Sequence, residues 1–266
     1  MFTPVIPIGG LPGWSLLNRT IERQSALFSA APALQRDTDH FREAIAGVKS
    51  VADLVSDRRL LRVALGAFGL QEDIDSRAFI RAIIEQGTEA RDALANRLAD
   101  DRYRGLANAF GFLAGPSGGS PPPDFADRII DQFRQREFET AVGEQDAGLR
   151  LALNADREFA ALAAEDSSDN ALWFRILGTP PLREVFEVAL GLPQSFAQLD
   201  LDRQLQDIRS LAARRLEISS PRDLARDDLR EGVIRQFLLR DQLASVTVNS
   251  SQSIALTLLQ SAPRLF

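Results

Sequence analysis

The sequence contains no cysteine and one histidine. Without cysteine the chain has no disulfide, no thiolate metal site and no cysteine nucleophile, and the absence suits either redox compartment. His40 would have to be the base of any Ser-His-Asp triad, and a zinc site with one histidine and no cysteine would be unusual. We therefore expect His40 to be a surface or capping residue at a helix start.

Long apolar runs are missing as well. No window reaches the roughly 18–20 consecutive apolar residues that a membrane-spanning helix needs. The N-terminal stretch MFTPVIPIGGLPGW lacks a basic region and carries three prolines, which is atypical of a cleaved signal peptide. We expect a chain without a membrane span that is cytoplasmic as synthesised, and export that needs no cleaved signal is compatible with this sequence.

The chain has no excess of positive charge. It carries 31 basic and 37 acidic side chains, for a net charge of −6, and Lys49 is the only lysine. Binding to nucleic acid requires a concentrated positive face that neutralises phosphates. We therefore expect no nucleic-acid partner.

Motifs of catalysis and ligand binding are absent too. The glycine pairs Gly9-Gly10 and Gly118-Gly119 follow no strand and match no phosphate-binding loop. The acidic clusters EDID (72–75) and EDSSD (165–169) each precede an apolar helical segment, where carboxylates stabilise the positive helix end, and they lack the glycine and glutamate of a calcium loop. We expect no catalytic, cofactor-binding or metal-binding residues, no cofactor, and no enzyme activity.

What the sequence does contain is helical periodicity. Between Arg58 and Phe68, apolar residues recur at helical spacing, and Gly69 can end the helix in the left-handed conformation. Similar segments recur along the chain, and a long helix is expected after residue 124. The segment ASVTVNS (244–250) is the best strand candidate, but it equally fits a loop before a last helix over 250–260. The pattern predicts an all-α fold.

The clearest interruption is AGPSGGSPPPD, residues 114–124. Its prolines and glycines oppose helix formation, and it offers nothing apolar to bury. We predict a helical unit over 1–114, a Pro/Gly-rich connection over 115–124, and a second helical unit over 125–266.

A short sequence occurs once on each side of this interruption. RRLLRVALGAFGL (58–70) and REVFEVALGLPQS (183–195) share V-A-L-G at a separation of 125 positions. At the same separation Asp75 aligns with Asp200 as a helix cap, and Ile80 with Leu205 as a core position. The matched signature comprises Arg58, Val63, Ala64, Leu65 and Gly66 in the first copy, and Arg183, Val188, Ala189, Leu190 and Gly191 in the second.

The signature has a simple physical interpretation. A small alanine lets another helix approach closely, and the glycine, near the helix end, permits either a close contact or a positive φ angle. Chance is the alternative, since all four residues are common. Because cap and core positions also agree, we favour internal duplication: the second unit is a diverged copy of the first.

FREAIAGVKSVADLVSDRRLLRVALGAFGLQEDIDSRAFIRAIIEQG, followed by LADDRYRGLANAFGF, resembles the alphaproteobacterial family of unknown function DUF1217. VIRQFLLRDQL (233–243) is similar to the ending of the same unit, whereas GLPQS departs from GAFGL. The resemblance implies an alphaproteobacterial origin and an association with flagellar gene clusters. It supplies no activity and no catalytic residue.

Three functions are compatible with these observations. The first is a non-catalytic helical protein of flagellar assembly or structure that acts through protein–protein contacts, its partner unidentified and its export to the flagellum independent of a signal. In that case a last helix with Ile254, Leu258 and Leu259 on one side could pack on another subunit. The alternatives are a small-molecule-binding protein or an enzyme whose site forms only in the tertiary fold, and an adaptor that uses an apolar helix face.

Overall fold

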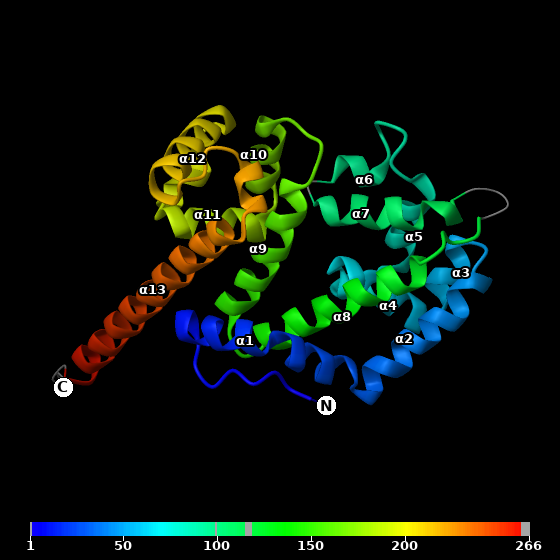
Figure 1. Cartoon of the computed structure of the whole chain (residues 1–266), viewed down its shortest axis with the longest axis horizontal. Helices are drawn as coiled ribbons and strands as arrows, with labels where there is room; N and C mark the ends of the chain where they lie inside the picture. The colour runs from blue at the N-terminus through cyan, green and yellow to red at the C-terminus, as the bar shows by residue number, and fades with distance from the viewer. Residues whose placement is uncertain (1, 99, 115–118, 262–266) are drawn as a thin grey trace, which may run out of the picture. The chain divides into compact units, whose positions relative to one another are not determined.

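The computed structural model describes residues 2–98, 100–114 and 119–261, apart from the side chains of 194 and 245–261 (Figure 1). Within these ranges the chain forms α-helices and short 3-10 helices and no strand, which confirms the predicted all-α class. Among the described helices, none combines the length and the apolar character needed to cross a bilayer.

The helices follow one another with short connections. Up to residue 143 they are α1 (Gly10–Ser29), α2 (Pro32–Ala44), η1 (Ile45–Gly47), α3 (Val51–Ser56), α4 (Arg58–Phe68), η2 (Gln71–Asp73), α5 (Arg77–Gln86), α6 (Leu94–Arg97), α7 (Asp101–Phe110), η3 (Gly111–Leu113) and α8 (Phe125–Gly143). The remainder are α9 (Ala147–Ala163), α10 (Asp169–Gly178), α11 (Pro180–Leu190), η4 (Gln194–Gln198), α12 (Leu201–Leu216), η5 (Pro221–Ala225) and α13 (Asp227–Ser261).

The described chain divides into two compact units. The first holds residues 2–6 and 17–145, and the second holds 7–16 and 146–261. The predicted boundary at 115–124 differs from this division, because α8 packs on α2 and α4 and so belongs to the first unit. The proline-rich segment interrupts the helical structure, but the helices on both sides of it belong to the first unit. Residues 115–118 of the predicted connection lie outside the described residues.

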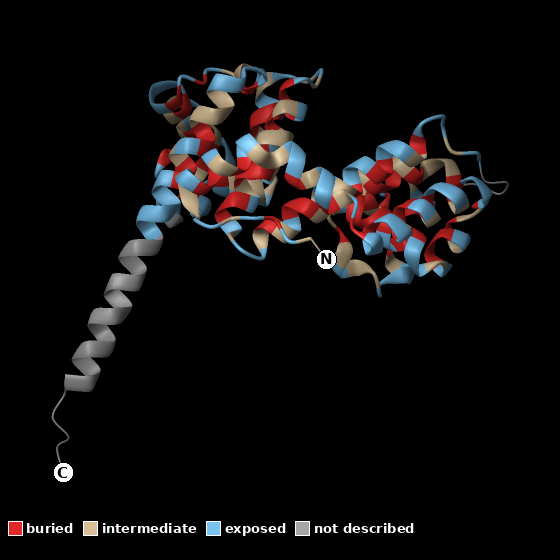
Figure 2. Cartoon of the chain, turned by 60° about the horizontal axis from the view of Figure 1, so that its bottom comes forward, coloured by how far each residue is buried: buried red, intermediate tan, exposed pale blue. Residues whose placement is uncertain are grey.

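Helix α4 is the centre of the first unit. It begins at Asp57, whose carboxylate accepts hydrogen bonds from the amides of Arg59 (2.9 Å) and Leu60 (3.1 Å). Its apolar residues, Leu61 and Leu65 among them, are buried against α2 and α8. Figure 2 shows such buried residues along the inner faces of the helices.

Helices α5, α6 and α7 add a smaller cluster to this unit. Ile83 of α5 is buried together with Ala95 and Ala107, and Phe79 and Tyr103 pack against them edge to face, 5.4 Å apart. Helices α6 and α7 therefore cover α5.

Helix α11 is the centre of the second unit, where α9, α10, α12 and α13 surround it. Pro180 starts the helix, where its missing amide hydrogen carries no cost. Phe186 packs edge to face with Phe159 (5.2 Å) and with Trp173 (5.7 Å). Trp14 is also buried, and its indole nitrogen donates to Glu231 at 3.0 Å. Both tryptophans are core residues.

Several expected helix ends are placed differently. Helix α2 starts at Pro32, so His40, which was expected at the surface or at a helix start, lies well inside it. Ser76, rather than Asp75, precedes α5, whereas Asp200 does cap α12, where it accepts from the amide of Arg203.

The second half of the chain shows two further differences. The long helix expected after the connection is broken between α8 and α9, because Asp146 caps a new helix at Ala147. The segment 244–250 is neither strand nor loop, since α13 runs through it without interruption. The side chains of Ile254, Leu258 and Leu259 lie outside those that the structure describes.

Candidate functional site

Both copies of the repeated signature lie on the central helix of a unit. Ala64 and Leu65 in α4 are buried, and so are Ala189 and Leu190 in α11. The signature residues therefore belong to two separate cores. The arginine that opens each copy has a different environment in each unit.

Arg58 and Arg183 make different contacts. Arg58 is exposed and pairs with Asp75 at 2.8 Å. Arg183 is half-buried, pairs with Glu187 at 2.6 Å and donates to Gln204 at 3.0 Å. These contacts hold neighbouring segments of one unit together.

The two signature glycines perform different tasks. Gly66 lies inside α4, where an added Cβ would come within 2.5 Å of the Phe133 ring on α8, so this position requires a close approach. Gly191 follows α11 with a φ of 61°, and in the first unit that conformation belongs to Gly69, with a φ of 71°. By backbone geometry Gly191 therefore corresponds to Gly69. The V-A-L-G alignment instead pairs Gly191 with Gly66, three residues earlier.

The chain turns in the same manner after Gly69 and Gly191. The amide of Leu70 donates to the carbonyl of Leu65 at 2.9 Å, and the amide of Leu192 donates to Glu187 at 2.8 Å. Each bond satisfies a carbonyl at the end of an eleven-residue helix. The central helices of the two units thus have the same length and end in the same backbone conformation.

Arginines from neighbouring helices lie over the end of α4. Arg136 of α8 donates from Nε to the carbonyl of Ala67 at 3.0 Å. Arg102 of α7 donates to the carbonyl of Gly69. Cations are favourable at this position, because the last carbonyls of a helix carry partial negative charge.

The end of α11 is built in the same way. Arg215 of α12 donates to the carbonyl of Leu190, and the guanidinium of Arg240 on α13 lies directly over Gly191. Arg215 therefore joins α12 to the end of α11.

Helices α8 and α13, which bring Arg136 and Arg240 to these ends, share a sequence pattern. IIDQFRQRE and VIRQFLLRD both contain isoleucine, glutamine, phenylalanine, arginine and an acidic residue at identical spacing. The phenylalanine is buried in both cases. The V-A-L-G match does not include this second pattern, although its letters are present in the sequence. The matched residues are Ile130, Gln132, Phe133, Arg136 and Glu137, and Ile234, Gln236, Phe237, Arg240 and Asp241.

The single histidine joins two helices of the first unit. His40 Nε2 lies 2.7 Å from the carboxylate of Asp57, the cap of α4. Burial by itself would raise the pKa of Asp57, but hydrogen bonds from His40, Leu60 and Arg59 outweigh it and lower that pKa. The pair resembles two members of a triad, yet Asp57 is fully engaged as a helix cap.

Tyr103 and Asp73 form another polar pair in this unit. The hydroxyl donates to the carboxylate at 2.7 Å. Burial and then this hydrogen bond raise the pKa of Tyr103 to about 12, so the phenol is neutral at physiological pH. The pair fastens α7 to η2.

Carboxylates gather near the start of α9 in the second unit. Burial, and next the charge of Asp241, raises the pKa of Glu184. Burial and the charge of Asp146 raise the pKa of Asp241. In the described part of the chain no group of three histidine, aspartate or glutamate side chains could hold a metal ion.

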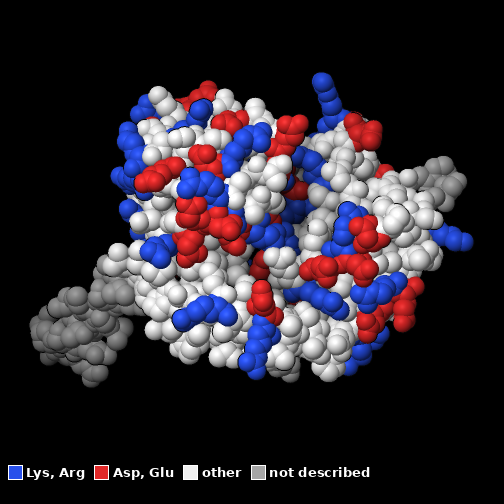
Figure 3. Space-filling model, in the orientation of Figure 1, with Lys and Arg blue, Asp and Glu red and all other residues white. Residues whose placement is uncertain are grey.

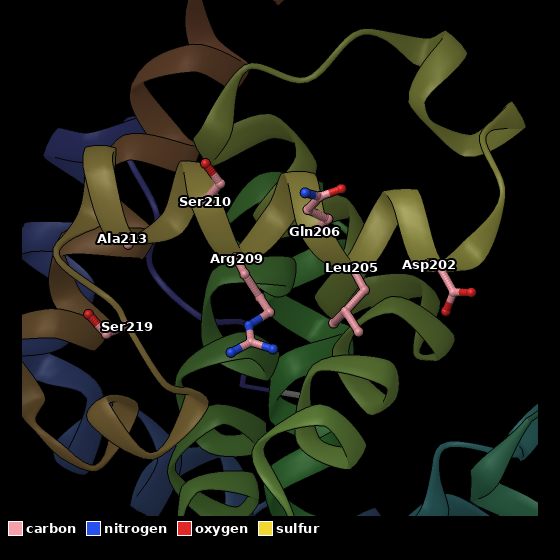
Figure 4. A pocket seen from close by; sticks show the side chains of 7 residues that line it. All are labelled: Asp202, Leu205, Gln206, Arg209, Ser210, Ala213 and Ser219. Carbon is pink, nitrogen blue, oxygen red and sulfur yellow. The ribbon is translucent and has the colours of Figure 1, made fainter.

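A groove with a volume of about 530 Å³ runs along α12 (Figure 4). Arg209 extends across it and donates to Asn170 of α10 at 2.8 Å. Leu205, expected in the core, is only partly buried and lies in this groove. The sequence spacing places these residues on one side of α12, but only the packing shows that the side is open. The lining residues are Asp202, Leu205, Gln206, Arg209, Ser210, Ala213 and Ser219.

The surface carries no extended region of one charge in the view of Figure 3, where basic and acidic side chains are interspersed. On α12 itself Arg203 pairs with Asp207 at 3.2 Å. The lining of the groove combines a leucine and small residues with one acidic and one basic side chain. This composition is suited to binding another protein surface.

Comparison with known proteins identifies relatives without an assigned activity. The crystal structure of protein AGR_C_984 from Agrobacterium tumefaciens matches with a TM-score of 0.71 and 24% identity, covering 91% of this chain and 99% of that one. This similarity shows a shared fold. No curated protein matches the sequence. The family described as protein of unknown function DUF1217 matches residues 67–225, more than half of the chain, and the chain belongs to this family.

Proposed function

We propose that this protein is a non-catalytic helical component of flagellar assembly or structure that acts through protein–protein contacts. The flagellar part of the proposal derives from the gene neighbourhood that the family resemblance implies. Export to the flagellum without a cleaved signal is part of the same proposal.

The observation that carries the protein-contact part is the apolar surface around α12. Leu199 and Leu201, at the start of this helix, are 41% and 55% exposed. Leu201 lies one helical turn before Leu205, which lines the groove together with Arg209. Exposed leucines next to a groove with a polar rim are typical of a surface that binds another protein.

A second candidate is a small-molecule-binding protein or an enzyme, and the size of the groove favours it. A volume of about 530 Å³ falls in the usual range for ligand sites. Arg209 could bind a carboxylate or a phosphate. Thermal-shift screening over metabolites and nucleotides separates the candidates, since a ligand specific for the folded state raises the Tm.

Gene deletion tests the proposed function. We expect the deletion strain to swim poorly or to have filaments of altered length, and the wild-type gene to restore both. A gene carrying Leu205→Glu should fail to restore them. The matched control is Leu27→Glu, which changes an exposed leucine in the first unit and should restore both. Normal motility and filaments in the deletion strain would contradict the flagellar role.

A further inference from the structure

Among the described residues, the groove is lined by α12 itself and by Ser219, which follows this helix. In the first unit, α6 and α7 follow α5 and pack on it. In the second unit, only η5 lies between α12 and α13, and Asp202, Leu205, Gln206 and Arg209 stay on the groove side. Exposed Leu201 lies one helical turn before Leu205 at the start of this helix.

The charges on this surface have a self-complementary arrangement. Asp202 and Arg209 stand at equal distances along α12 on either side of the point between Leu205 and Gln206. A two-fold axis at that point would set two copies of α12 antiparallel. Asp202 of each copy would then face Arg209 of the other, so that two ion pairs form. Complementary charges of this kind fix the register of a contact.

The apolar residue of the groove lies next to the same axis. Leu205 is within one residue of the axis, so the leucines of the two copies would contact each other across it. Ala213, a small residue further along the groove, leaves room for the segment that precedes α12 of the second copy.

We propose that the groove side of α12 binds a second copy of this chain, as an antiparallel helix pair with Asp202 facing Arg209. The inference rests on the proposed use of this surface for protein contacts, but not on the flagellar role. The contact is small, and each copy carries a net charge of −6. The dimer is therefore weak and depends on concentration.

Charge reversal combined with mixing tests the pairing. Asp202→Arg should abolish the dimer because two guanidinium groups would face each other twice, and Arg209→Asp should abolish it through facing carboxylates. Sedimentation velocity should detect at least about tenfold weaker self-association in each variant. An equimolar mixture of the two variants should dimerise again, because every facing pair is then complementary.

The control is Arg214→Asp, which makes the same charge change on an exposed residue of α12 outside the groove and should leave the dimer intact. Recovery in the mixture shows that both variants are folded, even though Arg209→Asp loses the bond to Asn170. A wild-type chain that stays at 29.3 kDa up to about 1 mM would overturn the proposal, as would a mixture that stays monomeric. Normal motility of the deletion strain alongside a confirmed dimer would remove only the flagellar role.

Discussion

Helices α5 and α12 occupy the same place in their units, directly after the central helix and a 3-10 turn, yet they end up in different surroundings. Helices α6 and α7 pack on the side of α5 that carries Ile83, which is buried, and Phe79, which is partly buried. On α12 the groove side remains open. A shared construction at the centre of each unit thus leaves one unit closed and the other with a surface for contacts.

The two central helices resemble each other more closely than the helices after them do. Both α4 and α11 have eleven residues, a glycine at positive φ, and arginines over the last carbonyls. They differ at one position. The Phe133 ring approaches α4 closely at Gly66, whereas α11 has Val188 at the corresponding position. We interpret the likeness as internal duplication, with α8 and α13 as a second matching pair.

The largest expected effect comes from a charge in either central helix. Leu65→Asp and Leu190→Asp each place a carboxylate at a fully buried position in an apolar core. We expect each to lower the free energy of unfolding by about 4 kcal/mol or more. Chemical denaturation monitored by circular dichroism measures this, and native stability in either variant would contradict the core assignment.

An intermediate effect should distinguish two alignments of the central helices. The alignment by letters matches Gly66 with Gly191, and the alignment by backbone geometry matches Gly66 with Val188. Gly66→Ala pushes a methyl group against the buried Phe133 ring and should cost about 1–3 kcal/mol. Val188→Ala, at the matching position of α11, removes part of a half-buried side chain and should cost less than about 1.5 kcal/mol. Equal costs at the two positions would argue against the register that the backbone geometry favours.

A smaller loss of stability, equal in the two units, is expected from substitutions at the ends of α4 and α11. Gly69→Ala and Gly191→Ala each force an alanine to adopt a positive φ, at about 1–2 kcal/mol. Gly178→Ala, at the end of α10, is the control, because an added Cβ meets no atom there and φ is not positive. Thermal unfolding measures all three, and an unchanged Tm for Gly69→Ala would refute the left-handed ending.

The smallest effect concerns pH and has opposite signs in the two units. Asp57 has a lowered pKa, so its contribution to stability is present above its ordinary pKa and is lost as the pH falls through the lowered value. Asp241 has a raised pKa, so its contribution is present at low pH and is lost as the pH rises through that value.

Two isosteric variants measure this difference at pH 7. Asp57→Asn should lower the free energy of unfolding, although asparagine still caps α4, whereas Asp241→Asn should raise it, each by about 0.5 kcal/mol or less. Shifts of the same sign would show that the carboxylates of the two units are not in the contrasting environments described.

Local signals in the sequence were enough for the helices but not for their packing. Asp200 and the glycines at 69 and 191 marked real helix ends, because capping and positive φ depend on a few neighbouring residues. The unit boundary could not be read from the prolines, since membership of α8 depends on its contact with α4, distant in sequence.

The groove was unpredictable for a related reason. The spacing of Asp202, Leu205 and Arg209 places them on one side of a helix, as it would for a buried side. Which side of α12 stays open depends on the absence of helices like α6 and α7 from this unit. That absence is a property of the tertiary structure.

Because the chain has no cysteine of its own, one introduced thiol tests the role of α12 directly. Gln206→Cys places the thiol beside the proposed two-fold axis, and Arg81→Cys places one on the exposed side of α5. Under mild oxidation we expect a covalent dimer from Gln206→Cys and only monomer from Arg81→Cys. Equal cross-linking of both, or none at position 206, would contradict the account.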